Sequence, residues 1–243
     1  MEKTPIVASA PEGTFKLKDI KPTTSLPGIT RAESESHIEV SYQNRFSLYD
    51  AEAQQSRPIV QEKTIKTDKR VPKLGVMLVG LGGNNGSTFT AGIIANKRGL
   101  TWETKAGEQK ANFYGSFTQS ATTHVGFKFN EEDGTLTDVF KPIKELLPMV
   151  NPIDFDVCGW DISDFNLYDA AKRSHVLEPT LLEQLKGDLE AIKPMKAVLN
   201  PDFIAANQAD RTNNVFEGTN EQLISKLRED IRDCKARNDK VIM

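Results

Sequence analysis

The amino-acid sequence predicts an α/β fold in which crossover helices connect a mostly parallel sheet. An apolar run that ends at Val79 leads into a glycine-rich turn and then a helical pattern. Further strand-like apolar runs at 155–160 and 240–243 alternate with amphipathic helical segments. This alternation favours parallel strands, because a parallel pair needs a long crossover and a helix supplies it.

The composition is that of a protein with a hydrophobic core and no special affinity for polyanions. Of 243 residues, 38% are apolar and 27% are charged, with a net charge of −3. This charge gives no electrostatic reason to bind nucleic acid or an anionic membrane. No apolar run approaches the roughly 20 residues that span a bilayer, and no secretory signal is visible. The only cysteines, Cys158 and Cys234, indicate buried thiols in a reducing compartment, so we expect a cytoplasmic protein.

Composition divides the chain into three segments. Residues 1–35 are rich in Pro, Ser and Thr, and we expect a disordered or loosely attached extension. Residues 36–70 are predicted to be extended, with a strand over 37–49 and then a polar linker. Residues 71–243 are predicted to form the α/β domain.

The turn after the first strand of this domain carries the most chemical information. Glycine lets the backbone turn sharply and approach a ligand, and the next helix presents free N–H groups to an anion. We expect that helix to begin near Ser87 and to end at Gly99. The layout favours a dinucleotide, and the P-loop alternative fails because Ser87, not lysine, follows the last glycine. The glycines are Gly80, Gly82, Gly83 and Gly86.

Their spacing departs from the usual Gly-x-Gly-x-x-Gly pattern, because three residues separate Gly82 from Gly86. Asn84 and Asn85 fall where a tight turn often needs positive φ. They are either ligands of phosphate or ribose, or turn residues only.

The middle of the domain shows helical and turn patterns in succession. A hairpin or turn is predicted over 125–136 and an amphipathic helix over 138–150. A second helix is expected over 164–174 with Ser163 as its N-cap. A third begins at Pro179, because proline is favoured in a first helical turn.

The last part of the chain alternates in the same way. A strand is predicted over 197–205 and a polar loop over 207–214. Thr219 and Gln222 have capping-box spacing and open an amphipathic helix. The strand that begins at Lys240 should be buried and followed by a functional loop, and the sequence stops inside it. We therefore expect a domain that is incomplete at its C-terminus, from a truncated product of a longer protein.

Candidate chemical groups are few. A dinucleotide site of this type places an acidic residue about 20 residues beyond the glycines, on the ribose hydroxyls. Glu103 lies near that spacing and Asp161 ends a predicted strand, and spacing alone decides for neither. No metal site and no catalytic residue are identifiable, because no histidine has a partner at ligand spacing and no nucleophile has a base beside it. The histidines are His37, His124 and His175.

Several long stretches resemble one family. The longest is Pro72-Lys-Leu-Gly-Val-Met-Leu-Val-Gly-Leu-Gly-Gly-Asn-Asn-Gly-Ser-Thr88. This segment is similar to the cofactor loop of the myo-inositol-1-phosphate synthase family, also called inositol-3-phosphate synthase. Other stretches match in the same order and extend the resemblance from about residue 38 to the end. They are residues 99–105, 111–116, 159–162 and 201–208.

This resemblance implies a Rossmann-like domain and NAD-dependent isomerisation of glucose 6-phosphate to inositol phosphate, for inositol and phospholipid synthesis. In the family, NAD⁺ oxidises C5 of the sugar, enolisation and intramolecular aldol closure follow, and the NADH reduces the ring. The resemblance also implies a cytosolic homotetramer. It favours Asp161 over Glu103 as the acidic partner. The cofactor-binding positions that it implies are Gly82, Gly83, Asn84, Asn85, Asp161, Ala197, Val198, Gln208 and Arg211.

Two departures from the family pattern limit that expectation. Ala197 stands where the family has a serine, so a hydroxyl contact to NAD is missing. The family's further cofactor loop and the lysines and aspartates of its sugar site are absent from this sequence. Because acid–base work on an enediol needs such groups, we expect no synthase activity from this chain alone. The alternative is a non-catalytic short form that binds NAD or associates with full-length subunits.

Overall fold

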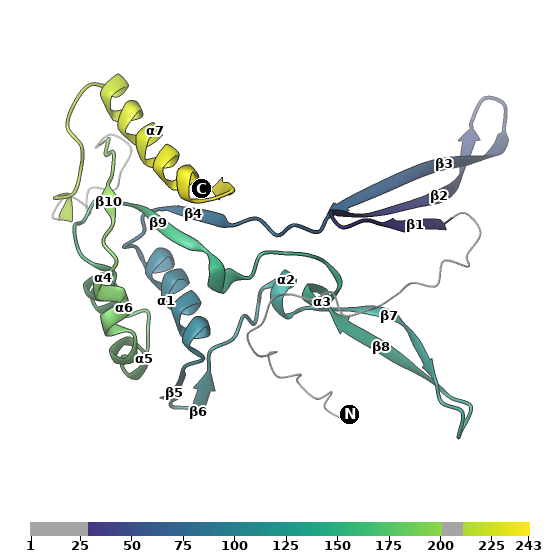
Figure 1. The fold of residues 1–243 in the computed structure, drawn as a ribbon, viewed down its shortest axis with the longest axis horizontal. Coiled ribbons are helices and arrows are strands. Elements are labelled where there is room, and N and C mark those ends of the chain that lie inside the picture. Colours follow the sequence, from purple (N-terminus) through teal and green to yellow (C-terminus); the bar gives the residue numbers. More distant parts are fainter. Residues whose placement is uncertain (1–28, 201–210) are drawn as a thin grey trace. The chain divides into compact units, whose positions relative to one another are not determined.

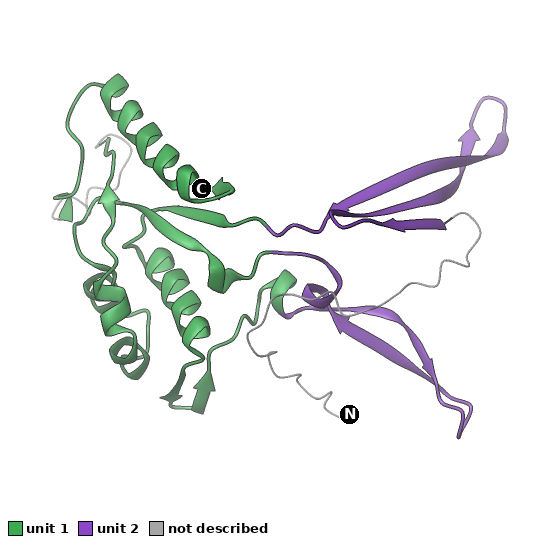
Figure 2. Cartoon of the chain, in the orientation of Figure 1, with its two compact units in different colours: residues 1–11, 72–119, 150–243 green, residues 12–71, 120–149 purple. Residues whose placement is uncertain are grey.

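The structure is a computed structural model, and it describes residues 29–200 and 211–243. Outside the described residues lie most of the predicted N-terminal extension, residues 201–205 of the strand expected over 197–205, and Gln208. The described residues form two compact units (Figure 2). Unit 1 comprises residues 72–119 and 150–243, and unit 2 comprises residues up to 71 and 120–149.

Unit 1 contains a parallel sheet of four strands in the order β10-β9-β4-β11 (Figure 1). Every neighbouring pair in it is parallel. This confirms the α/β prediction and the strands expected over 155–160 and at Lys240. The strands are β4 (Leu74–Val79), β9 (Asp156–Asp161), β10 (Met195–Lys196) and β11 (Lys240–Ile242).

Two apolar clusters cover the two faces of this sheet. In β4, Leu78 packs with the cluster that holds α1, α4, α5 and α6, and Met77 packs with the cluster that holds α7. Successive side chains of a strand point to opposite faces, so the alternation places helices on both sides. The helices are α1 (Asn84–Arg98), α4 (Leu167–Ser174), α5 (Pro179–Gln184), α6 (Lys186–Glu190) and α7 (Asn220–Arg237).

Helix ends in unit 1 follow local sequence signals, with one exception. Gly99 ends α1 in the left-handed region at φ 61°, as predicted. Thr219 and Gln222 form both hydrogen bonds of the predicted capping box of α7. The N-cap predicted at Ser163 is wrong, because Asn166 caps α4 by accepting from the backbone N–H of Asp169.

The helix predicted at Pro179 begins there but is split into α5 and α6 by a break at Leu185. Smaller elements complete unit 1. They are the hairpin of β5 (Thr101–Thr104) and β6 (Gly107–Lys110) and the 3₁₀ turn η1 (Pro152–Asp154). The short helix α2 (Phe117–Ser120) lies at the boundary of the two units in the sequence.

Unit 2 consists of antiparallel strands. A three-stranded sheet has the order β1-β2-β3, and it includes the strand predicted over 37–49. Residues expected to be a polar linker instead form β3, because fourteen residues of it pair with β2. A polar strand is stabilised by that pairing whatever its own composition. The strands are β1 (Ile29–Glu33), β2 (His37–Asp50) and β3 (Gln55–Asp68).

The second sheet of unit 2 is the hairpin of β7 (Thr122–Phe129) and β8 (Leu136–Pro142). The hairpin or turn predicted over 125–136 is confirmed. The helix predicted over 138–150 is wrong. Helical spacing of its apolar residues coincides with a strand whose partner lies earlier in the chain, and pairing decides the outcome. Only α3 (Ile143–Leu146) is helical, starting directly after Pro142.

Candidate functional site

The turn between β4 and α1 is held against the neighbouring strand by its own backbone. The N–H groups of Gly80 and Leu81 both donate to the carbonyl of Trp160 in β9, at 2.8 and 2.9 Å. Gly80 has φ 84°, which favours glycine. A Cβ at Gly86 would overlap the carbonyl oxygens of Leu81 and Gly80. The glycines therefore permit a tight approach of turn and helix that side chains would prevent.

Helix α1 presents an uncapped N-terminus at this turn. Its N-cap residue is Gly83, and no side chain hydrogen-bonds to the first helical N–H groups. The hydroxyl of Ser87 donates to the Gly83 carbonyl at 2.8 Å and does not cap those N–H groups. An N-terminus of this kind attracts anions through its free N–H groups and the helix dipole.

Asn84 and Asn85 are the first two residues of α1. The prediction that they occupy positive φ is wrong, because in the described chain only Gln54 and His175 do so among non-glycine residues. The helix starts three residues earlier than the apolar pattern indicated. The Asn84 and Asn85 backbone N–H groups therefore belong to the anion-attracting first turn.

Asp161 lies directly beside this turn at the end of β9. Its Oδ2 accepts from the backbone N–H of Gly82 at 2.9 Å, and its Oδ1 accepts from the N–H of Ser163 at 3.0 Å. The residue is only 7% exposed. The rival candidate Glu103 is an exposed residue of the β5–β6 hairpin. The structure thus brings Asp161, not Glu103, into hydrogen-bond contact with the glycine turn.

Two further predicted positions lie just after β10. Ala197 is buried in the cluster under α7 and forms a parallel bridge with Val215, and Val198 is half-buried. Asn214, which is also buried, donates through its side chain to the carbonyls of Asp161 and Met195. Backbone and amide contacts thus join the ends of β9 and β10.

Arg173, in the last turn of α4, was missed by sequence analysis. Its Nη2 donates to the carbonyl of Gly82 at 3.3 Å, and its guanidinium lies over the ring of Phe165 at 5.4 Å. Burial and the nearby Arg211 lower the pKa of Arg173, and Asp161 acts in the opposite direction. The available signal was its position on the helix that follows the strand ending at Asp161.

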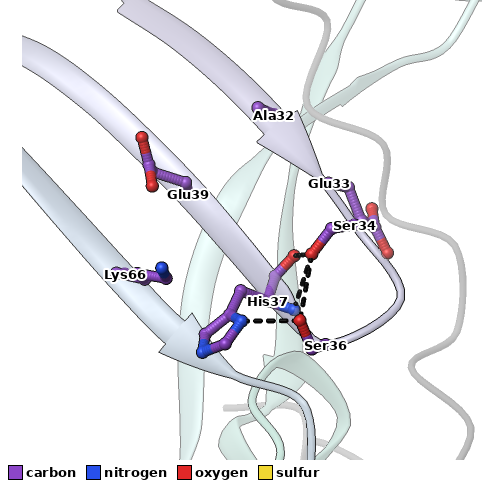
Figure 3. A pocket seen from close by; sticks show the side chains of 7 residues that line it. All are labelled: Ala32, Glu33, Ser34, Ser36, His37, Glu39 and Lys66. Atoms are coloured by element: carbon purple, nitrogen blue, oxygen red, sulfur yellow. Dashed lines mark hydrogen bonds between the residues drawn. The ribbon is translucent and has the colours of Figure 1, made fainter.

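The remaining candidates lie on other elements. His175 ends α4 with φ 52°, a structural position. His37 lines a shallow hollow in unit 2 and its Nδ1 is 2.7 Å from the Ser36 hydroxyl (Figure 3). That hollow contains none of the predicted cofactor residues. The residues that line it are Ala32, Glu33, Ser34, Ser36, His37, Glu39 and Lys66.

Two features are absent from the described parts of the chain. Across residues 29–200 and 211–243, no three His, Cys, Asp or Glu side chains are grouped to hold a metal ion. Within the same ranges, no helix has the length and apolarity needed to cross a membrane.

Comparison with known proteins gives a consistent result. The NAD-binding family profile described as myo-inositol-1-phosphate synthase matches residues 74–243. Inositol-3-phosphate synthase isozyme 1 of Arabidopsis thaliana is 46% identical over 224 residues, which are 89% of this chain and 43% of that protein. The Mesembryanthemum crystallinum inositol-3-phosphate synthase is 50% identical over 191 residues, 76% of this chain and 36% of that protein.

A solved structure agrees. The crystal structure of inositol-3-phosphate synthase from Caenorhabditis elegans superposes with a TM-score of 0.79 and 38% identity, over 90% of this chain and 42% of that chain. The chain thus spans less than half the length of the relatives that it matches. The profile covers well over half of the chain and includes the glycine turn and Asp161. This chain therefore belongs to the myo-inositol-1-phosphate synthase family, and its matched domain is one that binds NAD.

Proposed function

We propose that this chain forms the NAD-binding half of an inositol-3-phosphate synthase and binds NAD without completing the reaction by itself. The observation that carries the proposal is the hydrogen bond from the N–H of Gly82 to Asp161. It joins an acidic residue to a glycine turn and an uncapped helix at the carboxyl ends of parallel strands. In open α/β sheets this edge, where the strand order reverses, is where dinucleotides bind.

The residues at this edge fit the cofactor. A Cβ at Gly86 would fill the space in which the turn and α1 meet, and the helix N-terminus carries no side-chain cap. The backbone of Gly82, Gly83, Asn84 and Asn85 would hold the diphosphate. Asp161 would accept from a ribose hydroxyl with its remaining lone pairs.

The other proposed contacts lie near the ends of β9 and β10. Ala197 and Val198 would line the NAD site with backbone and apolar surface, since neither offers a hydroxyl. Arg211 would pair with the anionic part of the cofactor. Gln208 is proposed as a further contact from the family resemblance, and it lies outside the described residues. NAD would supply a hydride acceptor at this site.

The full activity is proposed for the longer proteins of the family. There the substrate is glucose 6-phosphate, the product is inositol 3-phosphate, and the enzyme is a cytoplasmic homo-oligomer that serves phospholipid synthesis. Enolisation and aldol closure need positioned acids and bases next to the sugar. In the described residues Asp161 is hydrogen-bonded to the glycine turn, which supports NAD binding as the role of this chain.

A second candidate function is a short form that associates with full-length subunits. Large apolar side chains on the strands of unit 2 favour it, including Phe127 at 62% exposure and Phe140 at 57%. Exposed apolar patches commonly mark contact surfaces. This role also predicts no turnover by the chain alone, and it does not require NAD.

Titration calorimetry with NAD on the purified 243-residue chain tests the proposal. The unmodified chain should bind NAD, and Gly86→Ala should weaken binding at least about tenfold, because the new methyl group pushes the helix from the turn. Gly92→Ala is the matched control, since it lies in the same helix and its Cβ would meet nothing within 4 Å. A thermal melt of each variant shows whether it folds.

The outcomes separate the candidates. NAD binding that Gly86→Ala weakens and Gly92→Ala spares supports the proposed site. Absence of NAD binding by a folded, unmodified chain would contradict it and favour the association role. Release of inositol phosphate from glucose 6-phosphate by the chain alone would overturn the predicted inactivity.

A further inference from the structure

The Gly82 peptide is held from both sides by charged side chains. Its N–H donates to Asp161, and its carbonyl accepts from Arg173. Helix α4 brings Arg173 there, because helical side chains lean toward the N-terminus of their helix. Ala170 lies one helical turn before Arg173 and packs against the glycine turn. A Cβ added at Gly82 would lie 3.6 Å from the Cβ of Ala170. The turn is therefore fixed by α4 as well as by β9.

Arg173 brings a positive charge to this peptide. Arg211 acts on it as a like charge, and Asp161 acts in the opposite direction. The Arg173 guanidinium donates to the Gly82 carbonyl, beside the uncapped N-terminus of α1. A cationic side chain and free helical N–H groups both favour an anion at this turn.

The hydrogen bonding of Arg173 is also incomplete. Its Nη1 is buried and has no hydrogen-bond partner among the described residues. A buried donor without an acceptor is unfavourable, because it has lost its hydrogen bond to water. Stacking on Phe165 and the bond to Gly82 explain where the guanidinium lies, but they leave this nitrogen unused. An anionic oxygen drawn to the turn would supply the missing acceptor.

We propose that Arg173 is a positioning residue for the dinucleotide: it fixes the Gly82 peptide and contributes positive charge that attracts the cofactor's diphosphate. The inference rests on the proposed function, because it requires NAD to bind at the glycine turn. The inference assigns a role to Arg173 of α4, which is not part of the glycine-turn motif.

The test compares Arg173→Gln and Arg173→Lys with the unmodified chain. Calorimetry measures the Kd of NAD and ADP, which carry a diphosphate, and of adenosine, which does not, each at several salt concentrations. Arg98→Gln is the matched control, because Arg98 also holds a backbone carbonyl, that of Gln184, from the opposite end of α1. A thermal melt accompanies each variant.

Arg173→Gln should weaken NAD and ADP about tenfold and leave adenosine within about twofold. It should also flatten the dependence of Kd on salt, because one attracting charge is lost. Arg173→Lys should restore the salt dependence and part of the affinity, since it keeps the charge but loses the planar donor. Arg98→Gln should change neither.

Three outcomes would overturn the inference. If Arg173→Gln and the unmodified chain bind NAD with equal affinity and equal salt dependence, the inference about Arg173 is contradicted and the proposed function stands. Equal weakening of adenosine and NAD would show a purely structural role for Arg173. Failure of the unmodified chain to bind NAD would remove both the inference and the proposed function on which it rests.

Discussion

The two units bury their side chains very differently. Every residue that is buried in the described part of the chain lies in unit 1. Unit 2 has strands of up to fourteen residues but exposes large apolar side chains along them. Unit 1 thus contains its own core, whereas the strands of unit 2 are held mainly by hydrogen bonds between their backbones.

This difference shows what each unit requires from its surroundings. A sheet covered by helices on both faces gains its stability from buried apolar area. An isolated hairpin is marginal in water, and its apolar face needs a partner. We therefore expect unit 1 to respond strongly to changes of one methyl group, and unit 2 to tolerate much larger changes.

The largest effect should follow a single added methyl group in the sheet of unit 1. A Cβ at Gly159 in β9 would overlap the backbone of Leu78 in the paired strand β4. Gly159→Ala should therefore lower the free energy of unfolding by about 4 kcal/mol or more, measured by urea denaturation. Gly187→Ala in α6 is the control, because its Cβ would meet nothing and alanine favours a helix. If Gly159→Ala lowers the free energy of unfolding only slightly, the sheet is loosely packed.

A matched pair of leucines compares the two units directly. Leu185 is fully buried in unit 1, and Leu136 in β8 is 63% exposed. Leu185→Ala should destabilise unit 1 by about 3 kcal/mol, because it removes packing and leaves a cavity. Leu136→Ala should change stability by less than about 0.5 kcal/mol. Urea denaturation of both variants measures the contrast. A comparable loss at Leu136 would mean that a partner, such as another copy, covers the strand in solution.

The same contrast explains which parts of the fold follow from the sequence. In unit 1, the cap at Gly99 and the capping box at Thr219 are local signals, and both were predicted correctly. In unit 2, β3 and β8 depend on pairing with strands elsewhere in the chain, and both were missed as strands. Local periodicity does not contain that information, because strand pairing joins distant residues.

The site divides in a similar way. The glycine turn was identified from its residues, but spacing could not choose between Glu103 and Asp161. Gly82 and Asp161 are 79 residues apart, and only the register of β4 with β9 brings them together. The family resemblance favoured Asp161 before the geometry was known. Neither spacing nor the family resemblance indicated Arg173, because its role depends on how closely α4 packs against Gly82.

The smallest expected effect concerns one proton inside unit 1. Burial first, and then the nearby Cys234, raise the pKa of the Cys158 thiol to about 12, and the two Sγ atoms are 3.8 Å apart. An unfolded cysteine has a pKa of about 8.5. Because the folded pKa is the higher one, the protonated thiol favours folding below pH 8.5, and this contribution is lost as the pH rises toward 12.

Alkylation measures this difference. At pH 8.5, iodoacetamide should modify Cys158 much more slowly in the folded chain than in urea, because the thiolate is the reactive form. Peptide mapping by mass spectrometry reports each cysteine separately, and the urea-unfolded chain is the control. Cys158→Ala should also reduce the loss of stability between pH 9 and 12. If Cys158 reacts equally fast in both states, water reaches the interface between β9 and α7, and unit 1 is less tightly closed than its burial indicates.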